Sequence, residues 1–310
     1  MDVVQKEQLS AMQAHLISPI ILGYLVMGVI LFIWSGFALT SRAIGASALT
    51  VADVALIRFL VPLILLIPFI PSHFNVIKQV RKSDLLFILL GGIPFLFLAS
   101  FGAKLAPTAY VGAILAATPP FFVAILSYIF YRQLVSIKRF LMLSIIMIGI
   151  LIMVLGGLGK TSMDMLYGIG FLLGASLAWA GYILALKRAA LSAISVAIIL
   201  SYISFFILSI LMLTGIVESN IGSFSLQDAL PFLLVQGLGI GVVATIGFSY
   251  VVNLLGPIRT STIGALSPGL TALLAVPIFG EPLSVTILLG MSLTITGVIL
   301  SNRVYTNHTH

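Results

Sequence analysis

The side chains that could do chemistry in this chain are few, and they lie in or beside long apolar runs. Arg58 is the one strong charge well inside such a run, where a charge indicates function by default. It could pair with a substrate carboxylate or a backbone carbonyl, or its long stem could reach lipid headgroups. We favour a structural or gating role for Arg58 over direct binding, and we expect Glu281 to be a gating or structural charge as well. Gln236 is costly to bury unpaired, so it either donates to substrate or ties helices together. Glu281 precedes the last apolar run, where an acid favours the positive end of a helix dipole.

Two aromatic pairs repeat along the chain and contain its only two tryptophans. Trp34 and Phe37 are three residues apart, which places them on one helix face. Trp179 and Tyr182 have the same spacing. Each tryptophan lies about six or seven residues inside its run, roughly 9 to 10 Å from the end and below the interfacial aromatic belt. The pairs could pack against neighbouring helices or line a cavity, and their repetition favours the cavity.

Two hydroxyl–proline pairs also repeat. Thr118-Pro119 and Ser267-Pro268 each fall near the middle of an apolar run. A proline inside a helix removes a backbone donor and clashes with the carbonyl four residues earlier. In lipid, such loosened backbone is tolerated only where it is buried in protein or faces a polar cavity. The matched pairs therefore indicate a hinge or a substrate contact rather than a plain kink.

Membrane-spanning helices must position these residues. Hydrophobic residues make up 61% of the 310 positions and charged residues 7%, so lipid must solvate much of the chain. Cysteine is absent and the four histidines lie in tails or a loop, so we expect neither a metal nor another cofactor. Continuous runs of about twenty residues favour helices over barrel strands. We predict an all-α integral membrane protein with ten spans at 18–40, 49–70, 85–103, 109–130, 139–158, 166–186, 194–215, 229–252, 260–279 and 284–301.

The loop charges predict the orientation of these spans. With the N-terminus in the cytoplasm, most Lys and Arg residues fall on the inner side, and the outer loops hold only Arg42, Lys104 and Lys160. We therefore expect both termini in the cytoplasm and the protein in a bacterial inner membrane. Because the positive charge follows this pattern, we expect the lipid bilayer and a small-molecule substrate as partners, and no nucleic acid.

The two halves of the chain match beyond the aromatic pairs. Residues 105–107 (Leu-Ala-Pro) resemble residues 255–257 (Leu-Gly-Pro), and Gly149 corresponds to Gly297. Each half has five predicted spans, an odd number, so the second half must enter the membrane with opposite polarity. We expect a tail at 1–17, repeat one at 18–158, repeat two at 159–302 and a tail at 303–310.

These motifs resemble the EamA-type family of the drug/metabolite transporter superfamily. The residues that carry the resemblance are the Trp-x-Gly-aromatic segments at 34–37 and 179–182, and Gly-Glu-Pro-Leu-Ser at 280–284 before a glycine-bearing last span. The resemblance implies a central cavity between the halves and outward movement of small metabolites, often amino acids. The first half has Arg-Gln at 132–133 where the second has Glu-Pro, so the acidic element occurs once. No carboxylate is evident inside a span, which leaves facilitated movement and proton antiport both open.

We expect a secondary transporter of small amphipathic metabolites rather than an enzyme. A broad carrier of drugs, nucleosides or organic cations is an alternative, and a lipid scramblase is a weaker one. Gly-Ala-Ser at 174–176 is weakly similar to a serine protease site, but no span holds a histidine or lysine to activate Ser176. The glycines at 237–241 follow no strand, so close helix packing explains them better than a nucleotide loop. The oligomeric state is open, with a monomer as one option.

Overall fold

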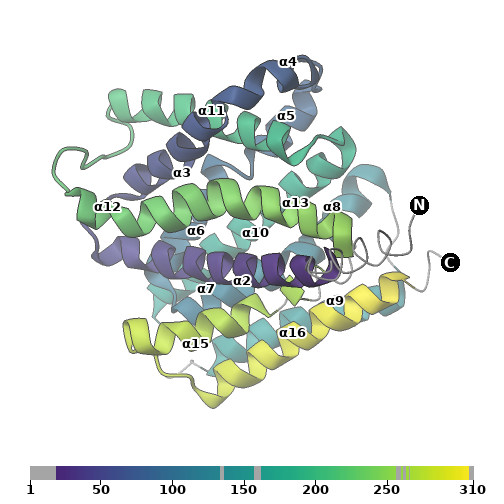
Figure 1. Cartoon of the computed structure of the whole chain (residues 1–310). Helices are drawn as coiled ribbons and strands as arrows, with labels where there is room; N and C mark the ends of the chain where they lie inside the picture. The colour runs from purple at the N-terminus through teal and green to yellow at the C-terminus, as the bar shows by residue number, and fades with distance from the viewer. Residues whose placement is uncertain are drawn as a thin grey trace, which may run out of the picture.

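A computed structural model describes residues 19–132, 136–156, 162–255, 260, 263–264 and 266–306, and these residues form helices and no strand (Figure 1). In the first half the helices are α2 (Pro19–Ala43), η1 (Ile44–Ala46), α3 (Val51–Leu65), η2 (Ile67–Phe69), α4 (Ile70–Lys78), α5 (Lys82–Leu89), α6 (Ile93–Leu105), α7 (Thr108–Ala117), α8 (Pro119–Tyr131) and α9 (Ile137–Gly156). In the second half they are α10 (Met163–Ala189), α11 (Ala193–Leu213), α12 (Leu226–Phe232), η3 (Leu233–Ala244), α13 (Thr245–Leu255), α15 (Ser267–Phe279) and α16 (Val285–Thr306).

Long apolar helices give the bundle the character of a membrane protein. Six of them are long and apolar enough to span a bilayer: Pro19–Ala46, Lys82–Leu105, Thr108–Tyr131, Met163–Leu186, Ala193–Leu213 and Leu226–Phe248. A seventh results if α3 and the following helix to Lys78, bent by 53°, form one span. The shorter apolar helices Phe140–Met153, Ser267–Phe279 and Val285–Leu300 fall below that length. The described residues thus form a multi-pass bundle, and ten spans stay a prediction.

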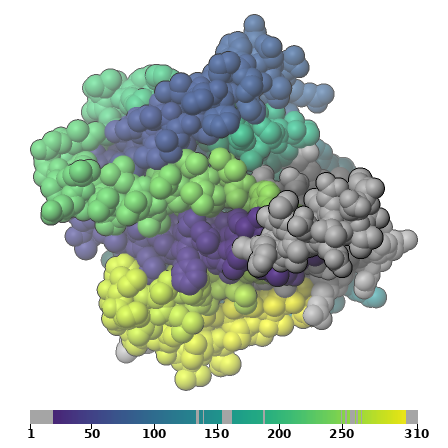
Figure 2. All heavy atoms as spheres, in the orientation of Figure 1, coloured from purple at the N-terminus to yellow at the C-terminus, as the bar shows by residue number. Residues whose placement is uncertain are grey.

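α2 runs through the bundle between two other segments of the chain. It contacts η3 and α13 on one side and α15 on the other, as Figures 1 and 2 show. Part of α2 nevertheless faces outward, where Leu25, Val29 and Phe32 are exposed by 55%, 53% and 61%. Such an apolar strip on a long helix suits contact with lipid chains rather than with water.

In two of the apolar runs, a helix begins at or just before a proline. α7 ends at Ala117 and α8 begins at Pro119, where the missing N–H leaves no intrahelical bond unmade. α15 likewise begins at Ser267, with Pro268 in its first turn. Pro119 therefore lies within the span Thr108–Tyr131 and interrupts its helical hydrogen bonding at Thr118.

Glycines allow α9 and α16 to pack closely along one edge of the bundle (Figure 1). A methyl group added at Gly149 would lie 2.6 Å from the Gly290 carbonyl oxygen. One added at Gly297 would lie 2.7 Å from Ile146 Cγ1. Small residues are used in this way wherever two membrane helices approach backbone to backbone.

Changing Gly149 to alanine is expected to lower the stability of the folded protein by about 1 to 2 kcal/mol, because overpacking outweighs the gain in helix propensity. Thermal unfolding in detergent measures this change. Gly170→Ala is the matched control, since Gly170 lies in α10 with no atom within 4 Å of an added methyl group. Equal melting temperatures for the two variants would contradict the packing argument.

Candidate functional site

Arg58 and Gln236 meet in the interior of the bundle, although they are 178 residues apart in the chain. Arg58 lies on α3 with 8% of its surface exposed, and its Nη1 donates to Gln236 Oε1 over 3.0 Å. Gln236 is fully buried, and its Nε2 donates to Thr40 Oγ1 over 2.9 Å, with Ser41 Oγ at 3.4 Å. Gln236 thus ties η3 to α2 and α3. Arg58 points into the bundle, so the alternative in which its stem reaches the lipid headgroups does not hold.

Glycines bring η3 close enough to α3 for this contact. A methyl group at Gly237 would lie 2.7 Å from Val61 Cγ2, and one at Gly241 would lie 3.1 Å from the Arg58 carbonyl oxygen. η3 is a π-helix from Leu233 to Ala244, and π-helical turns occur frequently at functional sites. The interpretation of residues 237–241 as a helix-packing surface is confirmed.

Aromatic rings surround the Arg58 guanidinium. Its Cζ lies 5.1 Å from the centre of the Phe37 ring and 5.9 Å from that of the Phe95 ring. The two rings stack on each other with centroids 5.8 Å apart. Ring faces attract a cation, which offsets part of the free energy needed to bury Arg58. Phe95 carries no repeat or polar neighbour in the sequence, so sequence reasoning missed it.

Three of the four aromatic candidates lie together, whereas the fourth lies apart. The Trp179 ring centre is 4.9 Å from that of Phe95 and 4.7 Å from that of Tyr182, so these rings continue the cluster that begins at Phe37. Trp34 instead lies on the side of α2 that faces α13, where its ring centre is 5.3 Å from that of Phe248. The tryptophans are thus placed in different side-chain clusters despite their matching sequence positions.

Hydroxyl groups donate to backbone carbonyls near the proline breaks. Thr118 Oγ1 and Ser176 Oγ both donate to the Ile114 carbonyl, over 2.8 and 3.2 Å, just before α8 begins. At the second break, Ser35 Oγ donates to the Ser267 carbonyl over 3.4 Å. The Ser176 and Ser35 bonds each link an opening helix of one half, α10 or α2, to a proline-containing run of the other half.

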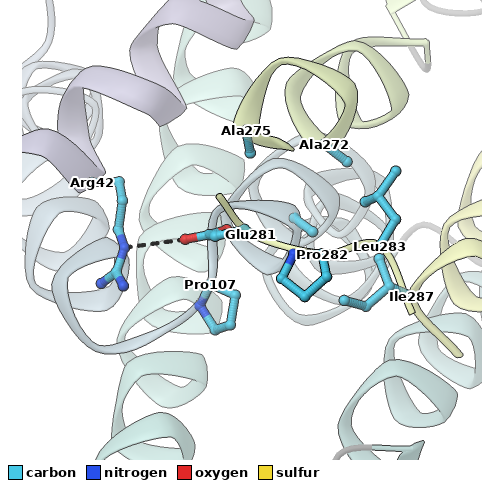
Figure 3. Close-up of a pocket in the computed structure, with 9 residues that line it drawn as sticks. Arg42, Pro107, Ala272, Ala275, Glu281, Pro282, Leu283 and Ile287 are labelled. Carbon is cyan, nitrogen blue, oxygen red and sulfur yellow. Dashed lines mark ion pairs between the residues drawn. The ribbon is translucent and has the colours of Figure 1, made fainter. Parts of the chain in front are cut away.

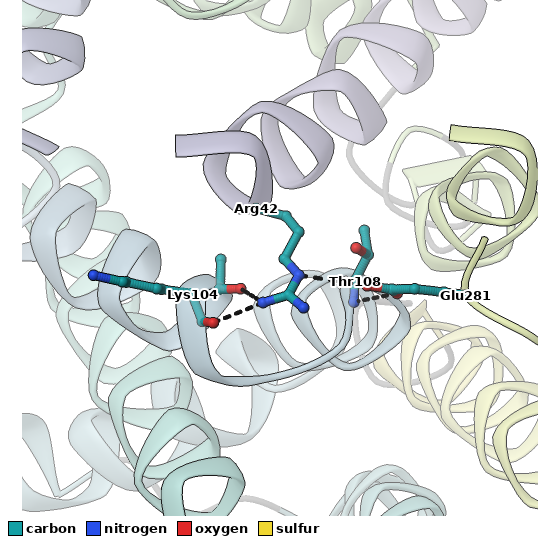
Figure 4. A network of polar contacts seen from close by, with 5 residues as sticks. Arg42, Lys104, Thr108 and Glu281 are labelled. Atoms are coloured by element: carbon teal, nitrogen blue, oxygen red, sulfur yellow. Dashed lines mark hydrogen bonds and ion pairs between the residues drawn. The ribbon is translucent and has the colours of Figure 1, made fainter. Parts of the chain in front are cut away.

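Glu281 joins the two halves at one end of the bundle, hereafter the Glu281 end (Figure 4). Its Oε1 lies 3.4 Å from Arg42 Nε, and its Oε2 accepts the Thr108 N–H over 2.8 Å. Arg42 Nη1 also donates to the carbonyls of Ala103 and Lys104, over 3.2 and 2.6 Å. Thr108 is the first residue of α7, so Glu281 complements the N-terminus of α7. The sequence had led us to expect this role at the N-terminus of the last helix.

A cavity of about 310 Å³ lies next to this ion pair. Figure 3 shows Arg42 and Glu281 at its edge, with proline, alanine and aliphatic side chains around it. The lining residues are Arg42, Pro107, Ala109, Ala272, Ala275, Glu281, Pro282, Leu283 and Ile287. They come from both halves of the chain, so separating the halves at the Glu281 end would open the cavity.

Changing Glu281 to glutamine is expected to raise the accessibility of this cavity. Because a partly exposed ion pair contributes about 0.5 to 1 kcal/mol, labelling of Ala275→Cys from the water phase should become about two to five times faster. The natural chain has no cysteine, so the maleimide labelling rate reports this site alone. Glu218→Gln is the control, because Glu218 is an exposed acid of the loop before α12. Equal maleimide labelling rates in the Glu281→Gln and Glu218→Gln variants would show that the ion pair of Glu281 does not control access to this cavity.

A second ion pair joins the halves at the opposite end, hereafter the Asp84 end. Arg188, after the span in α10, pairs with Asp84 near the start of α5, and its Nη2 also donates to Ser83 Oγ over 2.9 Å. The Asp84 carboxylate accepts this hydrogen bond and so raises the pKa of Arg188 above its ordinary value. Both ends therefore carry a polar tie between the two halves.

Comparisons with known proteins agree with this architecture. Residues 166–303 match the model of the EamA-like transporter family. A relative from Clostridium kluyveri, described as "Uncharacterized transporter", is 27% identical over 263 residues, which cover 80% of this chain and 82% of the relative. A solved structure described as "Crystal structure of protein" has a TM-score of 0.62 at 16% identity and covers 93% of this chain and 99% of its own. At that identity, the likeness concerns the fold alone.

The family match confirms the resemblance carried by the repeated sequence segments. The matching region begins within α10 and includes Trp179, Gln236 and Glu281. The relative extends the similarity over most of the chain, and six of the described helices are apolar and long enough for a membrane. The second half of the chain is thus similar to the EamA-like transporter family, and the similarity to a transporter over most of the chain, together with the apolar helices, supports a multi-pass membrane transporter.

Proposed function

We propose that the protein is a secondary transporter that moves small amphipathic metabolites such as amino acids outward by alternating access. The observation that carries this proposal is the buried network of Arg58, Gln236 and Thr40, which joins the two halves beside a cluster of aromatic rings. A polar group at this depth in an apolar bundle is costly, and in membrane proteins it marks a substrate pathway.

The transport mechanism requires two related halves, and several contacts support an inverted repeat of ten spans. In this proposal the bent α3–α4 pair and the shorter helices α9, α15 and α16 complete the six longer spans. Corresponding spans touch each other: α3 contacts α11, α7 contacts α15 and α9 contacts α16. Pairing of this kind suits a pseudo-two-fold axis in the membrane plane. The repeats would cover 18–158 and 159–302, with tails at 1–17 and 303–310.

The proline-broken helices α8 and α15 further support the relation between the halves. Each has 13 residues and begins with a proline in its first turn. Each is followed by a residue with a left-handed backbone, Arg132 with φ 54° or Gly280 with φ 65°. The breaks at Thr118-Pro119 and Ser267-Pro268 would serve as hinges, because a helix start is free to change direction there.

Alternating access would break one polar tie at a time. Opening the Glu281 end separates Arg42 from Glu281, and opening the Asp84 end separates Arg188 from Asp84. In both states the aromatic cluster of Phe37, Phe95 and Trp179 would form the wall against which the solute lies. Trp34 would line the α2–α13 side, and the transporter needs no partner chain in this scheme.

Counterflow in liposomes tests the proposed function. Vesicles containing the purified protein and unlabelled solute should accumulate labelled amino acids faster than empty vesicles, and an imposed pH gradient separates facilitated movement from proton antiport. Preferential uptake of nucleosides or organic cations would favour a broad-specificity carrier. Movement of fluorescent lipid without movement of any solute would favour a scramblase.

Reporter fusions test the orientation in a bacterial inner membrane. A fusion after Lys82, at the Asp84 end, should give a cytoplasmic signal. A fusion after Lys160, which lies outside the described residues, should give a periplasmic signal. The reverse pair of signals would place the termini outside the cell.

A further inference from the structure

We propose that Arg58 binds the carboxylate of the transported solute and that Gln236 occupies this position in the empty protein. This inference rests on the proposed transport function and narrows the substrate class. The solute is a monocarboxylate with an apolar or aromatic part, and an amino group is not required for binding.

The first argument is the missing counter-charge. Within the described residues, Glu281 and Asp84 form ion pairs, and their partners are Arg42 and Arg188. Asp53, on the same helix as Arg58, accepts bonds from the Thr50 N–H, Ser219 Oγ and the Asn220 N–H instead. The contacts of the Arg58 guanidinium among the described residues are the amide of Gln236 and the rings of Phe37 and Phe95, and none of these carries a negative charge. Arg58 is therefore a buried cation that can accept an anion.

The second argument is the number of hydrogen-bond donors. A guanidinium has five N–H groups in a planar fork. In the described part of the chain, one hydrogen bond from this fork is formed, from Nη1 to the amide oxygen of Gln236. A carboxylate would accept two parallel bonds and bring the missing charge, which makes it a stronger partner than a neutral amide. Gln236 Oε1 thus stands where one oxygen of a carboxylate would lie.

The third argument concerns the rest of the solute. Next to the guanidinium are the stacked rings of Phe37 and Phe95, and Trp179 continues this wall. These side chains favour an apolar or aromatic group. No described carboxylate among the contacts of this cluster would hold an ammonium group. An amino acid would bind through its carboxylate and side chain, and its amine would contribute little.

Three matched probes test the inference on the wild-type protein in detergent: 3-phenylpropionate, 3-phenylpropionamide and 2-phenylethylamine. We expect the acid to raise the melting temperature at about tenfold or more lower concentration than the amide, since charge-assisted bonds are lost with the amide. The amine should be weaker than both. Phenylalanine should bind within a few-fold of 3-phenylpropionate. Equal stabilisation by acid and amide would overturn the inference, as would no stabilisation by the acid.

Variants test whether Arg58 is the residue that prefers the acid to the amide. Arg58→Gln should bind acid and amide equally, whereas Arg58→Lys should retain part of the preference through its charge. Arg81→Gln is the matched control, because Arg81 is exposed at the start of α5 and should leave the preference intact. Preference retained in Arg58→Gln would overturn the assignment. If this variant does not fold, the comparison of acid with amide on the wild-type protein still decides the carboxylate preference.

Counterflow of the same compounds separates this inference from the proposed function. Transport of labelled phenylalanine that the amide inhibits as well as the acid would leave a transporter without a carboxylate site. Selective binding of the acid without transport of any solute would leave the site and refute the transport function. Inhibition by the acid alone supports both.

Discussion

Replacing Gln236 with glutamate should stabilise the folded protein and slow transport at least tenfold. The new carboxylate would lie 3.0 Å from Arg58 Nη1, in the place of the amide oxygen. Charge-assisted hydrogen bonds exceed neutral ones by about 1 to 2 kcal/mol, so the melting temperature should rise. The same ion pair would occupy the guanidinium permanently and exclude a solute anion.

Replacing Gln236 with leucine should have the opposite effect on stability and the same effect on transport. Arg58 would lose its acceptor inside the bundle, and a buried charge without a partner costs roughly 3 kcal/mol or more. Thermal unfolding and counterflow measured on both variants distinguish the two effects. Gln227→Glu, at an exposed position in α12, controls for the added charge. Unchanged melting and transport in Gln236→Glu would contradict the role given to this pair.

Replacing Trp179 with alanine should impair transport at least tenfold while membrane insertion stays normal. Loss of a large ring that contacts Phe95 and Tyr182 leaves a cavity, which should cost about 3 kcal/mol of stability. Trp179→Phe should recover most of both properties, because a smaller ring still fills part of the wall. Counterflow measures the first property, and thermal unfolding measures the second.

Trp34→Ala tests whether Trp34, like Trp179, lies in the solute pathway. Its contacts are with Phe248 and the backbone near Gly264, so we expect impaired transport together with looser packing of α2 against α13. Phe32→Ala is the control for both tryptophans, since Phe32 is 61% exposed on the outward face of α2. Normal transport kinetics in both alanine variants would remove the tryptophans from the solute pathway.

The sequence determined the helices and their composition but not the contacts between them. Backbone groups in lipid must bond within their own segment, so each long apolar run had to become a helix. Helices are found at every predicted run within the described residues. The same local reasoning placed Pro119 within an apolar span, but the chain alone does not reveal which segment packs against that position. In the structure, Ser176 of α10 donates to the Ile114 carbonyl one turn before Pro119.

The candidate site likewise has features that the sequence predicted and others that only the tertiary structure decided. Burial cost singled out Arg58 and Gln236 from the sequence, because a polar group in an apolar run must find a partner. Glu281 was singled out by its place before the last apolar run. Only the tertiary structure decided which partner each has. Arg58 meets Gln236 across 178 residues, and Glu281 reaches the first N–H of α7 across 173. Phe95 joins the site only through its place beside Phe37 and Trp179. Local chemistry fixes what a residue needs, whereas the packing of whole helices fixes what lies next to it.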